Sequence, residues 1–149
     1  MKPVLTHLAL GVRDLDRTVA FYRKHARLHV VHERRDGGTR VVWLSEQEER
    51  PDFVLVLFHV AGEPSPGPST LQHLGFALAS REEVDAAAAA GRADGVLMAE
   101  PVYAGPIVGY FCLLGDPDGN PVEFSYGQPI DPRRLAARQQ TAKDDPPVP

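Results

Sequence analysis

The sequence is poor in cysteine, and the other features that it lacks exclude several classes of protein. Cys112 is the single cysteine among 149 residues, so no disulfide can form within the chain. It falls in the apolar run 108–114, which predicts a small buried side chain and not a reactive thiol. No long basic run occurs and the formal net charge is −4, so nucleic acid is not expected as a partner.

Long hydrophobic runs are also absent. The longest apolar stretches have the length of strands, far short of a membrane span. Residues 1–4 lead directly into a predicted strand, without the apolar region and cleavage site of a secretory signal, so a cytoplasmic location is expected. The hydrophobic content of 43% suits one compact domain, or two small halves that share a core.

The chain contains two similar halves. His7 and His73 each stand in a strand of alternating apolar residues, which is followed by a polar helix start and then a helix. In the first half the pattern predicts a strand over 3–12, a helix from 14 or 15 to 26, and strands over 28–34, 39–45 and 53–60, with a hairpin at 36–38. In the second half it predicts a strand over 71–78, a helix from the capping box 80–83 to a stop at Gly91, strands over 95–102, 107–114 and 122–126, and a tight turn at 116–119.

This order of elements predicts an α+β fold made of two βαβββ modules with mixed sheets. The first module is expected over residues 1–60 and the second over 70–127, with a linker rich in proline and glycine at 61–69. Residues 128–149 form a tail, with a short helix expected over 131–140 and disorder over 144–149.

A carboxylate on the last apolar strand needs a physical explanation. Glu123 lies between Val122 and Phe124, and a buried, unpaired carboxylate there would be costly. Alternation puts His7, His73 and Glu123 on strand faces made mostly of small residues, while bulky apolar residues occupy the opposite faces. Two neutral imidazoles and one carboxylate are typical ligands of a divalent metal, so the three residues are predicted metal ligands.

The doubled unit resembles the vicinal oxygen chelate superfamily, which includes glyoxalase I, bleomycin resistance proteins, fosfomycin resistance transferases and type I extradiol dioxygenases. The resemblance covers residues 3–127. It is carried by Thr6-His7-Leu8, by 72–76 around His73 and, most specifically, by 116–124, which reads Asp-Pro-Asp-Gly-Asn-Pro-Val-Glu-Phe.

The resemblance implies strongly curved sheets that form a cup around the metal, with His7, His73 and Glu123 as ligands. It also implies a homodimer, in which one metal draws its ligands from one chain or from two. A His-His-Glu triad leaves coordination positions open for a small substrate with adjacent oxygen atoms. Fe(II) is the favoured metal, with Mn(II), Zn(II), Ni(II) and Co(II) as alternatives.

The ligand set separates the possible activities. Glyoxalase I relatives use a fourth ligand in the last strand of the first unit, where this chain has apolar residues at 55–57, and His59 could replace it only if the strand register shifted. Three ligands favour a dioxygenase-like enzyme over a glyoxalase-type lyase or isomerase. A protein of the bleomycin-resistance type, which sequesters a drug or metabolite without catalysis, is the third alternative.

Four aromatic residues are candidates for the substrate pocket. Tyr110 is expected on a strand that neighbours the strand of Glu123, and its phenol is the candidate catalytic group because it could donate to a bound oxygen. Trp43, Tyr103 and Tyr126 are the candidate substrate contacts, with packing in the core or at its rim as the alternative.

Overall fold

The structure, a computed structural model, describes residues 4–62 and 72–131. These residues form two compact units. The first unit contains the described residues up to Gln72 together with residues 116–120. The second contains His73–Gly115 together with the described residues from Pro121 onward. Most of the predicted linker, the predicted helix after Asp131 and the predicted disordered tail lie outside the described residues.

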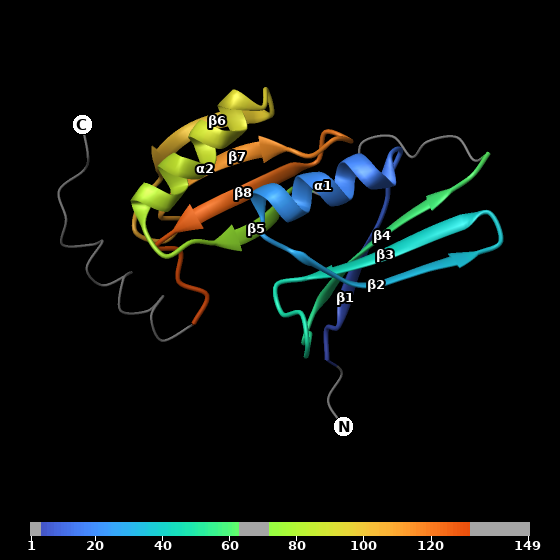
Figure 1. The fold of residues 1–149 in the computed structure, drawn as a ribbon. Helices are drawn as coiled ribbons and strands as arrows, with labels where there is room; N and C mark the ends of the chain where they lie inside the picture. The colour runs from blue at the N-terminus through green and yellow to red at the C-terminus, as the bar shows by residue number, and fades with distance from the viewer. Residues whose placement is uncertain (1–3, 63–71, 132–149) are drawn as a thin grey trace. The chain divides into compact units, whose positions relative to one another are not determined.

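The first unit is a four-stranded mixed sheet with one helix (Figure 1). Its elements in chain order are β1 (His7–Gly11), α1 (Leu15–His25), β2 (His29–Asp36), β3 (Thr39–Ser45) and β4 (Val54–Val60). The strand order is β1-β4-β3-β2, in which β1 and β4 are parallel and the other pairs antiparallel. The predicted hairpin between β2 and β3 is confirmed, with Gly37 at a φ of 58°.

The second unit repeats this arrangement. Its elements are β5 (Leu74–Ala77), α2 (Arg81–Ala93), β6 (Leu97–Tyr103), β7 (Tyr110–Gly115) and β8 (Pro121–Tyr126). The strand order is β5-β8-β7-β6, in which the edge strand β5 is again parallel to its neighbour β8. The predicted α+β fold of two βαβββ units is therefore confirmed.

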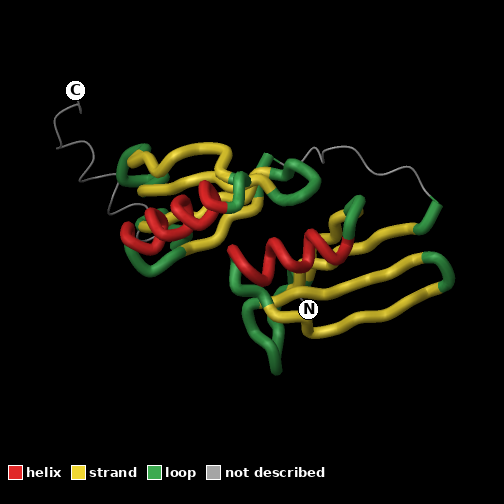
Figure 2. Tube along the Cα trace, turned by 45° about the horizontal axis from the view of Figure 1, so that its top comes forward, coloured by secondary structure: helices red, strands yellow, loops and turns green. Residues whose placement is uncertain are grey.

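In each unit the helix packs on one face of its sheet, and this face holds most of the core (Figure 2). In the first unit α1 contacts β3 and β4, and Leu44 and Leu57 on these strands are fully buried. In the second unit α2 contacts β6, β7 and β8, and Val122 and Phe124 are buried in the same way. Neither helix within the described ranges is long and apolar enough to cross a membrane.

Both helices begin where the sequence predicts. Asp14 caps α1, since its side chain accepts a hydrogen bond from the backbone N–H of Arg17 at 3.0 Å. Ser80 caps α2 by accepting from the N–H of Glu83 at 3.3 Å. The carboxylate of Glu83 in turn accepts from the N–H of Ala79 at 2.8 Å. The two side chains together satisfy two backbone N–H groups at the start of α2.

The predicted end of α2 at Gly91 is wrong, because the helix continues to Ala93. Gly95, at a φ of 72°, is the glycine that ends it. Its N–H donates to the Arg92 carbonyl at 3.1 Å, while the Val96 N–H donates to the Gly91 carbonyl at 2.8 Å, as in a Schellman motif. Gly91 serves packing instead, since a Cβ there would lie 2.2 Å from the Cδ2 of Leu114.

Gly91→Ala tests this close approach. Alanine is the better helix former, but its methyl group would overpack the fully buried Leu114, so the free energy of unfolding should fall by about 1–3 kcal/mol. Chemical denaturation measures the loss. The control is Ala90→Gly at the neighbouring exposed position, which should lose at most about 1 kcal/mol through helix propensity alone. A Gly91→Ala protein as stable as the parent chain would contradict the packing role.

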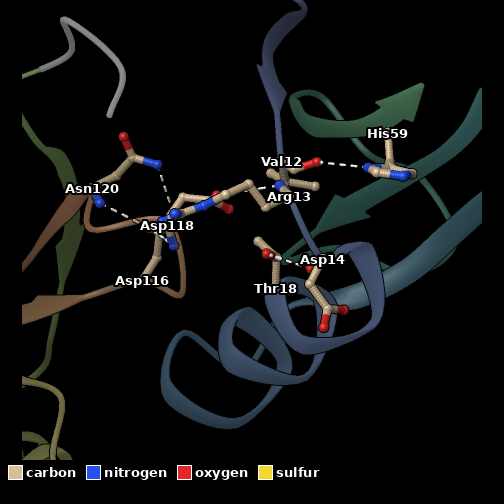
Figure 3. Close-up of polar contacts among 8 residues, drawn as sticks. All are labelled: Val12, Arg13, Asp14, Thr18, His59, Asp116, Asp118 and Asn120. Carbon is tan, nitrogen blue, oxygen red and sulfur yellow. Dashed lines mark hydrogen bonds and ion pairs between the residues drawn. The ribbon is translucent and has the colours of Figure 1, made fainter. Parts of the chain in front are cut away.

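The predicted turn before the last strand is confirmed, and Asp116 and Asp118 within it accept hydrogen bonds from residues of the first unit (Figure 3). Asp116 accepts hydrogen bonds from the backbone N–H groups of Asp118 and Asn120 at 2.9 and 2.8 Å. The hydroxyl of the buried Tyr22 donates to Asp116 at 3.0 Å, and the Arg13 guanidinium donates to Asp118 at 2.8 Å. These bonds join the turn to α1 and to the residue that precedes its N-cap.

Tyr22→Phe tests the hydrogen bond to Asp116. Loss of the donor leaves a buried carboxylate short of a partner, so the free energy of unfolding should fall by about 1–3 kcal/mol near neutral pH. Burial, followed by the nearby charge of Asp116, raises the pKa of Tyr22 in the folded chain. Tyrosine in the unfolded chain releases its proton above about pH 10, so this contribution to stability should be lost as the pH rises further. Denaturation curves of both proteins should therefore converge above about pH 10; a constant difference would contradict the assignment.

Candidate metal centre

Glu123 lies on the open face of the second sheet, the face that α2 does not cover. Its neighbours along β8, Val122 and Phe124, point to the covered face and are 0% and 1% exposed. Cys112, which is paired with Phe124, has its thiol 3.8 Å from the carbonyl of Val84 on α2, so that face lies under the helix. Although Glu123 points the other way, it is only 6% exposed. A carboxylate so well shielded from water needs a positive or hydrogen-bonding partner.

His73 supplies a neighbour for this carboxylate. It lies just before β5, two residues before Gly75, which pairs with Glu123 in the parallel ladder. The Nε2 atom of His73 is 3.7 Å from the Oε2 atom of Glu123. The His73 side chain remains 49% exposed, so its ring borders both the carboxylate and solvent. The structure thus brings together two of the three predicted ligands.

His7 occupies in the first unit the place that His73 has in the second. It stands two residues before Ala9, which pairs with Val56 in the parallel ladder of β1 and β4. Its ring is exposed, and its Nδ1 atom is 3.0 Å from the Thr6 hydroxyl. Since Glu123 pairs with the residue two beyond His73, the equivalent of Glu123 in the first unit is Val56. On the described strands of the first unit, the imidazole therefore has an apolar residue, and not a carboxylate, at the equivalent paired position.

His59 does not replace the missing carboxylate. It lies on β4 with the opposite parity to Val56, and it pairs with Arg40, which reaches Asp16 on α1. Its Nδ1 atom is 3.0 Å from the carbonyl oxygen of Val12 (Figure 3). The register shift that would bring His59 to the place of Val56 does not occur.

The donor set of the second unit fits a divalent metal. Bonds of about 2.0–2.2 Å from a metal to histidine nitrogen and carboxylate oxygen put adjacent ligand atoms about 3 Å apart. The 3.7 Å between His73 and Glu123 is close to this spacing, and the exposed imidazole can turn to reach it. Within the described residues no group of three or more histidine, cysteine or acidic side chains is gathered for a metal, and His7 is described within the first unit alone.

The three tyrosines proposed from the sequence lie on the face that α2 covers. Tyr110 pairs with both Tyr103 and Tyr126, so all three point to the side opposite to Glu123. The Tyr110 hydroxyl donates to Asp85 of α2 at 2.6 Å, and this hydrogen bond is the main reason that the pKa of Tyr110 is raised. The guanidinium carbon of Arg81 lies 5.1 Å from the ring centre of Tyr103 and 5.2 Å from that of Tyr110. Within the second unit these tyrosines therefore do not reach Glu123.

Trp43 has a different position from the tyrosines. It is paired with Val56 of β4, so it shares the open face of the first sheet with His7. His32, which pairs with it on β2, places its ring centre 4.9 Å from that of Trp43. The indole Nε1 is shielded from solvent and has no hydrogen-bond partner among the described residues. Of the four aromatic candidates, Trp43 is the one on the open face of its own sheet.

The sequence and the fold identify the family. The model of the Glyoxalase/Bleomycin resistance protein/Dioxygenase superfamily matches residues 4–124, and the chain belongs to this superfamily. The predicted membership of the vicinal oxygen chelate group is thereby confirmed. A relative from Pseudomonas aeruginosa, the uncharacterized protein PA2024, is 42% identical over 132 residues, which cover 89% of this chain and 94% of that protein.

Solved structures show the same fold. The trypanothione-dependent glyoxalase I of Leishmania major has a TM-score of 0.72 at 19% identity, covering 95% of this chain and 99% of that one. A glyoxylase/bleomycin resistance protein/dioxygenase domain from Frankia has a TM-score of 0.70 at 19% identity, covering 86% and 100%. The fosfomycin resistance protein FosX of Listeria monocytogenes, solved with Mn(II) and a dihydroxypropylphosphonic acid, has a TM-score of 0.67 at 22% identity, covering 89% and 98%.

Glu123→Gln tests whether the protein alone satisfies the buried carboxylate. If His73 at 3.7 Å is an incomplete partner, removal of the charge should leave the metal-free protein as stable as the parent, or up to about 1 kcal/mol more stable. Denaturation in the presence of a chelator measures this. Glu100→Gln is the control, because Glu100 is an exposed carboxylate paired with Arg92 in the same unit. A loss of about 3 kcal/mol or more for Glu123→Gln would show that protein groups already pair the charge fully.

Proposed function

We propose that this chain is a metal-dependent enzyme that acts on a small substrate with two adjacent oxygen atoms. His7, His73 and Glu123 are the proposed ligands of a divalent metal. The observation that carries the proposal is the carboxylate of Glu123, which is 6% exposed on an open sheet face with an imidazole nitrogen at 3.7 Å. A divalent cation explains why a charge is kept there, where a leucine or valine would be less costly.

The number of ligands favours dioxygenase-like chemistry over a glyoxalase-type lyase or isomerase. The place equivalent to Glu123 in the first unit is Val56, and His59 points to the other face, so a fourth protein ligand has no candidate on these strands. Two histidines and one carboxylate leave open positions and suit Fe(II). When bound, such a metal polarises the substrate oxygens or, as iron, activates dioxygen. The Mn(II) of the FosX structure supports a metal in this fold.

Metal content tests the proposal. Protein purified without oxygen should contain about one divalent metal per chain, with iron favouring oxygen chemistry and zinc or nickel favouring proton transfer. His7→Ala, His73→Ala and Glu123→Ala should each weaken Mn(II) binding about 100-fold or more, as measured by calorimetry, because each removes a direct ligand.

His59→Ala is the matched control, since it removes a histidine that points to the covered face. It should leave the metal affinity unchanged. A protein that purifies without metal and binds an aromatic ligand equally well after His73→Ala would overturn the enzyme proposal, and it would favour sequestration of the bleomycin-resistance type.

The source of the third ligand is a separate part of the proposal. We infer a homodimer, in which His7 of the same chain or of the partner chain completes the site formed by His73 and Glu123. If the partner chain supplies His7, a mixture of the His7→Ala and Glu123→Ala proteins should regain tight Mn(II) binding, because each mixed dimer contains one intact set of three ligands. The amount regained should approach one site per mixed dimer. No recovery after exchange of subunits would assign all three ligands to the same chain.

A further inference from the structure

We infer that Trp43 selects the substrate by contacting an apolar, planar group at the end remote from the metal. The inference rests on the proposed function, because it takes His7 as a metal ligand. It uses the first unit alone, where His7 and Trp43 lie on the same open face of one sheet.

A row of paired residues crosses this face from β1 to β2. Ala9 pairs with Val56, Val56 pairs with Trp43, and Trp43 pairs with His32. The row starts one alternation step from His7, and its first two side chains are small. Between His7 and the indole ring, the row therefore presents a surface of small apolar side chains, which is called the apolar floor below.

The spacing along this floor sets the size of the group that it can hold. Strands about 4.8 Å apart and about 6.6 Å per two residues put the Cα atoms of His7 and Trp43 about 12 Å apart. A substrate with a chelating end and a single ring has about the length needed to reach from the proposed ligand to the indole. The next row adds Phe58, which pairs with Val41, and so widens the apolar surface.

The contacts of the indole support a role beyond core packing. The His32 ring lies 4.9 Å and the Arg34 guanidinium carbon 5.9 Å from the centre of the Trp43 ring. Its N–H has no acceptor among the described residues, which is costly for a shielded donor. A small turn of the ring would let a ligand with an acceptor atom satisfy the N–H, while the ring face provides stacking.

The equivalent row of described residues in the second unit contains no aromatic side chain. In its equivalent row Gly75 pairs with Glu123, Glu123 with Leu113, and Leu113 with Ala99. Leu113 therefore stands where the first unit has Trp43, and Glu123 stands where it has Val56. The second unit has the carboxylate of Glu123 at this row, and the first unit has the indole of Trp43. We therefore assign the contact with the apolar end of the substrate to the first unit.

Two α-hydroxy acids that differ by one phenyl ring test the inference. Lactate and 3-phenyllactate offer the same pair of oxygens to the metal, so a difference in affinity reports the contact with the ring. The Mn(II)-loaded protein should bind 3-phenyllactate about tenfold more tightly than lactate in calorimetry. Trp43 is the single tryptophan of the chain, so its fluorescence should change with 3-phenyllactate and not with lactate.

Substitutions of Trp43 separate a contact from a structural role. Trp43→Ala should abolish the preference for 3-phenyllactate and leave the affinities for Mn(II) and lactate unchanged. Trp43→Phe keeps an aromatic ring and should keep most of the preference. Trp43→Leu keeps an apolar side chain without a ring and should lose the preference. The leucine protein tests the contact if the alanine protein does not fold.

The outcomes distinguish this inference from the proposed function. Equal affinities for the two acids in the metal-loaded protein, or a preference that persists in both Trp43→Ala and Trp43→Leu, would overturn the inference and leave the metal site standing. Failure of the parent chain to bind Mn(II) would overturn the proposed function and the inference with it.

Discussion

Each sheet has a helix on one face only, and this constraint decides what every strand residue can do. The residues that alternate toward α1 or α2 fill the core, as Leu57 and Phe124 do. The residues that alternate the other way lie on the open face, and among them are the proposed site residues His7, Trp43 and Glu123. Because side chains alternate along a strand, the position of a residue decides whether it faces the helix or the open side of the sheet.

The two units repeat one arrangement of strands and differ in the residues on their open faces. The parallel pairing of the first and last strands repeats in both, with an imidazole two residues before the paired position. Beyond that point the open faces diverge. One has a shielded carboxylate at Glu123, and the other has Val56 with an indole beside it. The proposed ligand Glu123 and the proposed aromatic contact Trp43 therefore lie on the open faces of different units.

Much of this arrangement could be predicted from the sequence. Alternation along the strands predicted the faces of His7 and Glu123, and the polar residues at 80–83 and 116–119 predicted a helix start and a turn that the structure confirms. These signals are local, because each depends on residues fewer than ten positions apart.

The features that could not be predicted depend on register between strands and on long-range contacts. Tyr110 was correctly expected on a neighbour of β8, but its face is set by pairing with Tyr126, and no local signal gives that register. Gly91 resembled a helix stop because the buried Leu114 that requires a glycine there is distant in sequence. The bond from Tyr22 to Asp116 spans 94 residues, and it was missed for the same reason.

That bond also affects the order in which the protein can be completed. The first unit includes residues 116–120, so it is discontinuous in the chain. While a ribosome is still making the second half, the nascent first half contains the residues of α1 and its sheet but lacks Asp116, which accepts from the Tyr22 phenol, and Asp118, which pairs with Arg13. The first unit therefore gains these contacts only when residues 116–120 have been made. A fragment that stops at Gln72 would lack the partners of Tyr22 and Arg13.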